Sequence, residues 1–167
     1  MTTTNASALR TCALLAFATF GEMAWAQDCA GARDLRASQL TGTWTVFKGG
    51  AQVSGAPMLG GSDKVSVQSS GGGITLEIEG QRFSLNRVPD SAAAWKWEAG
   101  GDVKVSSDGF ELVLGCDNDR LARFEGSQKV AGQLVTWRFM AETDRDAHIY
   151  WSFAGPPAAA GLFSLTK

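Results

Sequence analysis

The stretch ITLEIEGQRFSLN, residues 74–86, carries an apolar side chain at every second position on both sides of one glycine. Apolar residues occupy positions 74, 76 and 78 before Gly80, and positions 83 and 85 after it. Successive side chains of a β-strand point to opposite faces, so a period of two is typical of a strand with one buried face. The stretch therefore predicts two antiparallel strands joined by a short turn.

The same alternation recurs along the chain, at residues 95–97, 103–105, 110–115, 135–139, 149–153 and 163–165. Glycine-rich turn signals separate these segments at intervals of about ten residues; they lie at positions 49–50, 60–61, 71–73, 100–101 and 108–109. We predict an all-β fold, an antiparallel up-and-down barrel of about eight to ten strands. One short helical turn, at residues 34–40, precedes the first strand.

The composition suits one globular domain rather than a nucleic-acid-binding protein. Of 167 residues, 44% are apolar and 19% are charged, which is enough apolar material for one core. The net charge is -2, so the chain has no basic excess that would attract nucleic acid or an anionic membrane surface. No stretch is long enough to predict a membrane span.

The first 26 residues have the order of a secretory signal peptide. Arg10 precedes the apolar run TCALLAFATF at residues 11–20, and the small-residue signal Ala24-Trp25-Ala26 follows. We therefore expect residues 1–26 to be removed, leaving one domain over residues 27–167. The protein is then periplasmic or secreted.

Cys29 and Cys116 are the cysteines that remain after removal of the signal peptide, because Cys12 lies inside it. In an oxidising compartment two cysteines of a small domain are usually paired, which predicts a disulfide between them. The alternatives are two free buried thiols or a redox pair. Catalytic dithiols usually have C-x-x-C spacing, however, and these two cysteines are far apart.

The segment LTGTW, residues 40–44, resembles the opening of lipocalins and other calycin barrels, in which Gly-x-Trp follows a short helical turn. In those proteins the tryptophan closes the bottom of the barrel beneath a basic residue near the C-terminus. The resemblance implies an up-and-down barrel that carries a small apolar ligand. LTGTW also looks like the first avidin strand, but residues 45–48 lack the polar side chains expected to bind biotin.

A second part of the lipocalin pattern is incomplete. Thr143-Asp144 is similar to the first two residues of a Thr-Asp-Tyr turn, but Arg145 stands where the tyrosine is expected. The closing arginine is also missing, since Lys167 is the only basic residue after Arg145.

The sequence predicts no catalytic site and no metal site. The single histidine, His148, falls on the strand face opposite Ile149 and Trp151, which we expect to point outward. No nucleophile-elbow motif surrounds a serine, and one histidine with two paired cysteines is too few for zinc. The acidic clusters at 117–119 and 144–146 lack the glycine and distal glutamate of a calcium loop, so we interpret them as turns. We expect neither enzymatic activity nor a cofactor.

The aromatic residues carry the functional prediction. A barrel of eight strands can enclose one small ligand, and inward rings would line an apolar pocket. The candidate ligand-binding residues are Trp95, Trp97, Trp137, Trp151 and Phe139. The same rings could instead fill a solid core. A small apolar or amphipathic ligand is therefore the first expected partner.

The alternative is a module that binds a protein partner, such as an inhibitor of a cell-wall hydrolase. Such a module would use a protruding loop, and residues 49–61 and 117–120 are the candidates.

Cleavage after Ala26 has a direct test. We expect the exported protein to begin at Gln27, because the small residues Ala24 and Ala26 match the pattern that signal peptidase recognises. N-terminal sequencing of exported protein measures this, and an exported chain that keeps Met1 would contradict it.

Overall fold

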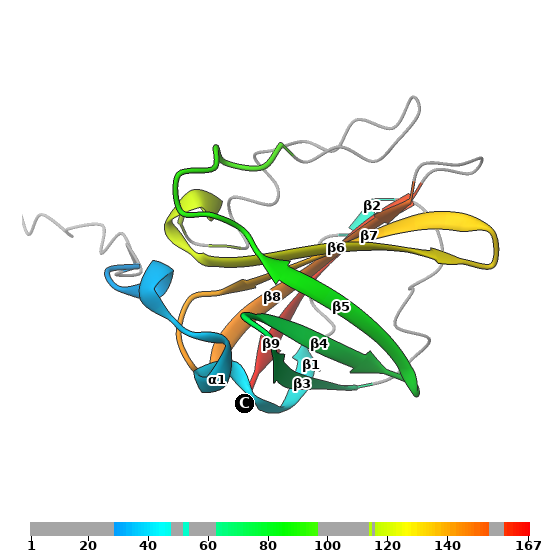
Figure 1. The fold of residues 1–167 in the computed structure, drawn as a ribbon, viewed down its shortest axis with the longest axis horizontal. Coiled ribbons are helices and arrows are strands. Elements are labelled where there is room, and N and C mark those ends of the chain that lie inside the picture. The colour runs from blue at the N-terminus through cyan, green and yellow to red at the C-terminus, as the bar shows by residue number, and fades with distance from the viewer. Residues whose placement is uncertain (1–28, 48–51, 54–62, 97–113, 115, 154–158) are drawn as a thin grey trace, which may run out of the picture.

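The structure is a computed structural model that describes residues 29–47, 52–53, 63–96, 114, 116–153 and 159–167 (Figure 1). The predicted signal peptide, Trp97 and the strand expected at 103–105 lie outside these residues. The short helices are η1 (Ala32–Asp34), α1 (Ala37–Leu40) and η2 (Asn118–Arg120). The strands are β1 (Gly42–Phe47), β2 (Gln52–Val53), β3 (Lys64–Ser70), β4 (Gly73–Ile78), β5 (Gln81–Arg87), β6 (Ala122–Val130), β7 (Gln133–Ala141), β8 (Asp146–Phe153) and β9 (Ala159–Thr166).

Eight antiparallel strands form a closed up-and-down barrel, as the alternation predicts. Each strand from β3 to β9 pairs with its neighbour in the chain, and β1 pairs with both β3 and β9. The two-residue strand β2 pairs with the beginning of β9, at Ala160 and Gly161. The helical turn predicted at 34–40 is present as η1 followed by α1.

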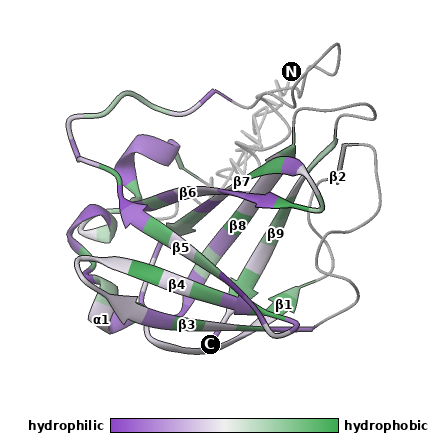
Figure 2. Ribbon diagram, turned by 45° about the vertical axis from the view of Figure 1, so that its right-hand side comes forward, coloured by the Kyte–Doolittle hydropathy of each residue, from purple (hydrophilic) through white to green (hydrophobic). Residues whose placement is uncertain are grey.

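The inner face of the barrel is apolar because its strands alternate. Figure 2 shows this alternation as green and purple bands along β4 and β5. The buried inner residues form one cluster, in which the ring of Phe139 lies edge-on to both Trp44 and Phe124.

Two glycines allow neighbouring strands to approach closely. A Cβ atom at Gly73 would overlap the carbonyl of Leu85, and one at Gly126 would overlap the carbonyl of Ser84. Glycine at these positions lets β4 and β6 pack tightly against β5, where the barrel wall bends.

One end of the barrel is closed by Trp44 together with the last residue of the chain. The indole N–H of Trp44 donates to the carbonyl of Leu40 at 2.9 Å. The ammonium of Lys167 lies 5.4 Å from the centre of the Trp44 ring and donates to the carbonyl of Gln39 at 3.1 Å. Lys167 thus joins the end of the chain to the turn before β1.

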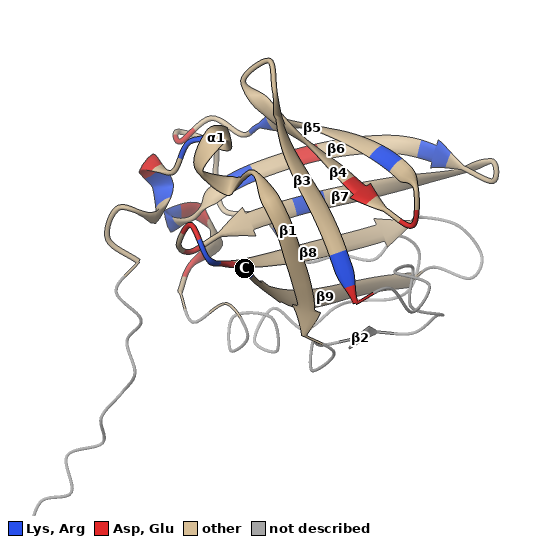
Figure 3. Ribbon diagram, turned by 90° about the horizontal axis from the view of Figure 1, so that it is seen from below, with Lys and Arg blue, Asp and Glu red and all other residues tan. Residues whose placement is uncertain are grey.

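Charged residues concentrate at this closed end. Figure 3 shows them around the N-terminal helices and adjoining turns, whereas β1 and β9 carry no charged residue. None of the helices in the described part of the chain is long and apolar enough to cross a membrane.

Part of the outer face of β7, β8 and β9 is buried, which the alternation does not predict. Alternation predicts that His148, Tyr150 and Met140 point outward, and they do, but all three are buried. Met140 and Tyr150 belong to a second apolar cluster, to which the N-terminal segment and residues near η2 also contribute. Leu114, expected in a strand, is a buried helical residue of this cluster.

The disulfide predicted between Cys29 and Cys116 is present and joins the two segments of this cover. The Cα atoms of the two cysteines are 6.7 Å apart, and the bond closes a loop of 87 residues. It therefore constrains the unfolded chain and also holds the second cluster on the sheet.

Replacing Cys116 with serine should lower the free energy of unfolding by about 2–5 kcal/mol, since the loop constraint is lost. Urea denaturation of protein beginning at Gln27 measures the change. As a control, dithiothreitol should destabilise the parent protein but not the variant. Two reactive thiols in unfolded, unreduced parent protein would contradict the bond.

Candidate functional site

Two tryptophans face each other across β7 and β8 inside the barrel. Trp137 and Trp151 are direct partners in the strand register. The ring of Phe83 lies 4.7 Å from that of Trp137, and Phe153 stacks on Trp151 with ring centres 5.9 Å apart. Gly161 makes room for the indole, because a Cβ atom there would lie 2.8 Å from Nε1 of Trp151.

The indole N–H groups of this pair have no hydrogen-bond acceptor among the described residues. Trp137 is 1% exposed and Trp151 is fully buried, so solvent cannot serve them either. The N–H of Trp44, by contrast, is bonded to a carbonyl. A buried donor without an acceptor costs about 1–3 kcal/mol, so two adjacent ones mark a place suited to an acceptor atom.

Three of the five predicted ligand-binding residues lie in the interior. Trp137 and Trp151 form the pair, and Phe139 lies nearer the closed end, against Trp44 and Phe124. Trp97 is outside the described residues.

Trp95 lies on the outer face of the barrel rather than in its interior. The guanidinium groups of Arg123 and Arg138 lie 5.1 and 4.8 Å from the centre of its ring. Its backbone N–H donates to the side chain of Asn118 at 2.8 Å, and its carbonyl accepts from the same side chain at 3.2 Å. Residue 95 belongs to the connection between β5 and β6, so strand alternation does not determine where it points.

Arg123 fastens this connection to the barrel. Its guanidinium donates to the carbonyls of Ala92 and Ala93 at 2.7 and 2.8 Å. Desolvation by burial lowers the pKa of Arg123 below the usual arginine value, and the nearby carboxylate of Asp119 opposes this shift. Arginine keeps its charge through such a shift, so the carbonyl contacts are charge-assisted.

The two loops predicted to contact a protein partner have different outcomes. Most of residues 49–61 lies outside the described part of the chain. Residues 117–120 do not form a protruding loop, because η2 packs against the barrel with Asn118 buried. The acidic cluster at 144–146 is the turn we expected. The hydroxyl of Thr143 accepts from the backbone N–H of Asp146 and donates to the carboxylate of Asp146.

A buried polar chain on the outer face links three segments. The hydroxyl of Ser164 lies 3.2 Å from Nδ1 of His148, and Nε2 of His148 lies 3.0 Å from a carboxylate oxygen of Glu142. In hydrolase triads the serine bonds Nε2 and the acid bonds Nδ1, the reverse of this order. Ser164 also lies inside β9, between β8 and β1. The chain therefore fits a structural role that holds the β7–β8 turn to β8 and β9.

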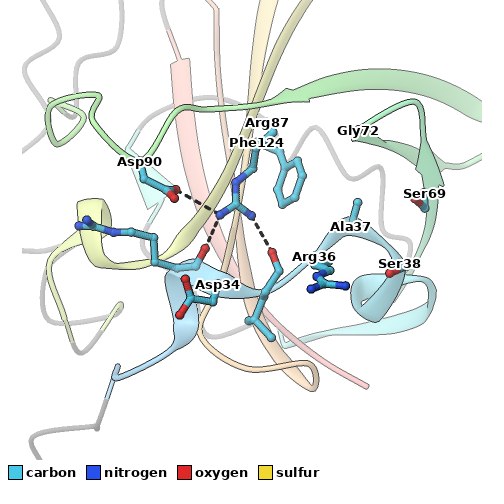
Figure 4. Close-up of a pocket in the computed structure, with 11 residues that line it drawn as sticks. Asp34, Arg36, Ala37, Ser38, Ser69, Gly72, Arg87, Asp90 and Phe124 are labelled. Atoms are coloured by element: carbon cyan, nitrogen blue, oxygen red, sulfur yellow. Dashed lines mark hydrogen bonds and ion pairs between the residues drawn. The ribbon is translucent and has the colours of Figure 1, made fainter.

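A cleft of about 470 Å³ opens at the closed end of the barrel (Figure 4). Its walls come from the N-terminal segment, the β3–β4 hairpin, the end of β5 and the start of β6. The lining residues are Arg33, Asp34, Leu35, Arg36, Ala37, Ser38, Ser69, Gly72, Arg87, Asp90 and Phe124. The sequence did not identify this cleft, because its residues are far apart in the chain and follow no motif.

No family model, curated protein or solved structure in the comparisons matches this chain. The barrel is thus established by its own strand pairing, and the likeness to lipocalins remains a resemblance carried by a few residues. Among the described residues no group of three or more histidine, cysteine or acidic side chains could hold a metal ion.

Replacing Glu142 with alanine should destabilise the protein by about 1–3 kcal/mol, because the buried ring of His148 loses its acceptor or donor partner. Glu125→Ala is the matched control: its ion pair with Arg138 is partly exposed and should contribute at most about 1 kcal/mol. Urea denaturation compares the two variants. Equal losses would contradict a structural role for the buried chain.

Proposed function

We propose that the protein binds a small apolar or amphipathic ligand inside the barrel, at the pair Trp137 and Trp151, and is not an enzyme. The observation that carries this proposal is the pair of buried indole donors with no acceptor in the described part of the structure. A ligand oxygen that reaches these N–H groups could accept from them, which would offset the cost of burying them.

The surroundings of the pair favour an apolar ligand body. Phe83, Phe153 and Val135 surround the two indoles, and aromatic walls with a few polar groups are typical of small-molecule sites. Indole N–H groups are neutral donors, so they match an uncharged acceptor such as a ketone, quinone or ester oxygen. An amphipathic molecule with one such oxygen is the ligand class we propose.

The closed end leaves the opposite end as the route of entry. Trp44, Leu40 and Lys167 seal one end, and the pair lies beyond Phe139 from that seal. The described interior is tightly packed, so the aromatic rings must shift when a ligand enters. The disulfide supports an oxidising compartment as the place of action, in agreement with the predicted signal peptide.

Nuclear magnetic resonance of the indole N–H groups tests the proposal directly. We expect a neutral ketone, quinone or ester to shift the signals of Trp137 and Trp151, since both gain an acceptor. Signals of Trp44 and Trp95 should stay in place, because one is already bonded and the other lies outside the barrel. The probes are 1,4-naphthoquinone, retinal and methyl laurate, with laurate as the charged counterpart of the ester.

Trp137→Phe should weaken binding of the best probe about threefold to tenfold, the loss of one hydrogen bond. Trp95→Phe is the matched control and should leave the affinity unchanged. Unfolding free energies of both variants separate lost binding from core damage. If no probe moves either indole signal, the carrier proposal fails. The protein-binding alternative then leads, and the exposed Phe47, beside residues 49–61, is the first residue to replace in a test of it.

A further inference from the structure

The cleft at the closed end is distinct from the barrel interior. Its floor includes Phe124, whose ring packs edge-on against Phe139 on the interior side. All of its lining residues are described, and they come from segments separated along the chain. Its volume of about 470 Å³ lies within the range of small-molecule sites.

Arg87 holds the cleft in shape without any ligand. Its guanidinium donates to the carbonyls of Leu35, at 2.7 Å, and of Arg33, and it lies 3.3 Å from the carboxylate of Asp90. The same group lies 5.2 Å from the centre of the Phe124 ring. Because its N–H groups already bond the carbonyls of the N-terminal segment, Arg87 holds that segment against the barrel and keeps the cleft preorganised.

The other side of the cleft carries polar groups that the fold does not use. Figure 4 shows Arg36, Ser38 and Ser69 on the side of Phe124 away from Asp34 and Asp90. Arg36 is exposed and forms no ion pair with any described residue. Within the described part of the chain, neither serine hydroxyl forms a hydrogen bond. This side of the cleft thus carries one guanidinium, unpaired among the described residues, and two serines, together with the apolar lining residues Phe124, Leu35 and Ala37.

We infer that this cleft binds a small organic anion with a flat apolar body, such as an aromatic carboxylate. The carboxylate would accept from the guanidinium of Arg36, with the hydroxyl of one of the lining serines as a second donor. A guanidinium matches a carboxylate through two parallel N–H donors, which gives direction as well as charge. The flat body would lie along Phe124 and Leu35, where it removes apolar surface from water.

The test uses 2-naphthoate as the probe and the uncharged 2-naphthamide as its matched counterpart. In ¹H–¹⁵N spectra of the full domain we expect saturable shifts at Arg36, Ser38 and Ser69 with naphthoate, at a Kd below ~1 mM. Naphthamide should bind more weakly, and the affinity for naphthoate should fall as salt rises, because the contact is ionic.

Arg36→Gln should weaken naphthoate binding roughly threefold to tenfold, the loss of one charge-assisted hydrogen bond at a partly exposed site. Arg36→Lys should restore part of it. Arg120→Gln removes an exposed charge outside the cleft and should change nothing. Trp137→Phe should also leave naphthoate binding intact, so failure of the barrel proposal and failure of this one are distinguishable. Equal affinity for the amide, or an unchanged Kd in Arg36→Gln, would overturn the inference.

Discussion

The indole of Trp44 is held between the carbonyl of Leu40 and the ammonium of Lys167, and the rest of the barrel depends on this contact. It joins the turn before the first strand to the last residue of the chain. Beside it, β1 pairs with β9, which closes the barrel and removes the sheet edges that would otherwise be exposed. The Trp137 and Trp151 pair lies on the side of Phe139 away from this seal.

Period-two alternation was sufficient to predict the barrel, because it reports which side chains share a face. It could not predict what covers the outer face. Tyr150 and Met140 lie on the face that alternation assigns to the outside, yet both are buried beneath the disulfide-linked segments. The sequence predicted the disulfide between Cys29 and Cys116, but it did not predict which face of the barrel the two cysteines would cover. The covered face depends on contacts between segments distant in the chain.

The same limit applies to the candidate sites. Trp137 and Trp151 lie within strands, so their inward direction followed from the pattern. Trp95 lies in a connection, where backbone direction is set by Asn118 and by the arginines on the outer face. The cleft at the closed end was not predictable at all, because a cavity arises from packing between segments and leaves no periodic trace. Its one sequence signal is the arginine-rich stretch at residues 33–36, which reads equally well as a solvated surface.

The two proposed sites differ in the chemistry they offer, and the difference follows from their positions. Inside the barrel, a charged ligand would lose its hydration without a described cation nearby, so the neutral indole donors suit an uncharged oxygen. At the closed end, solvent reaches the cleft, and the exposed guanidinium of Arg36 can bind an anion that stays partly hydrated. Phe124 and Phe139 separate the two sites and are packed against each other. Phe124 lines the cleft and Phe139 belongs to the core cluster, so one packed aromatic pair forms the wall between the two proposed sites.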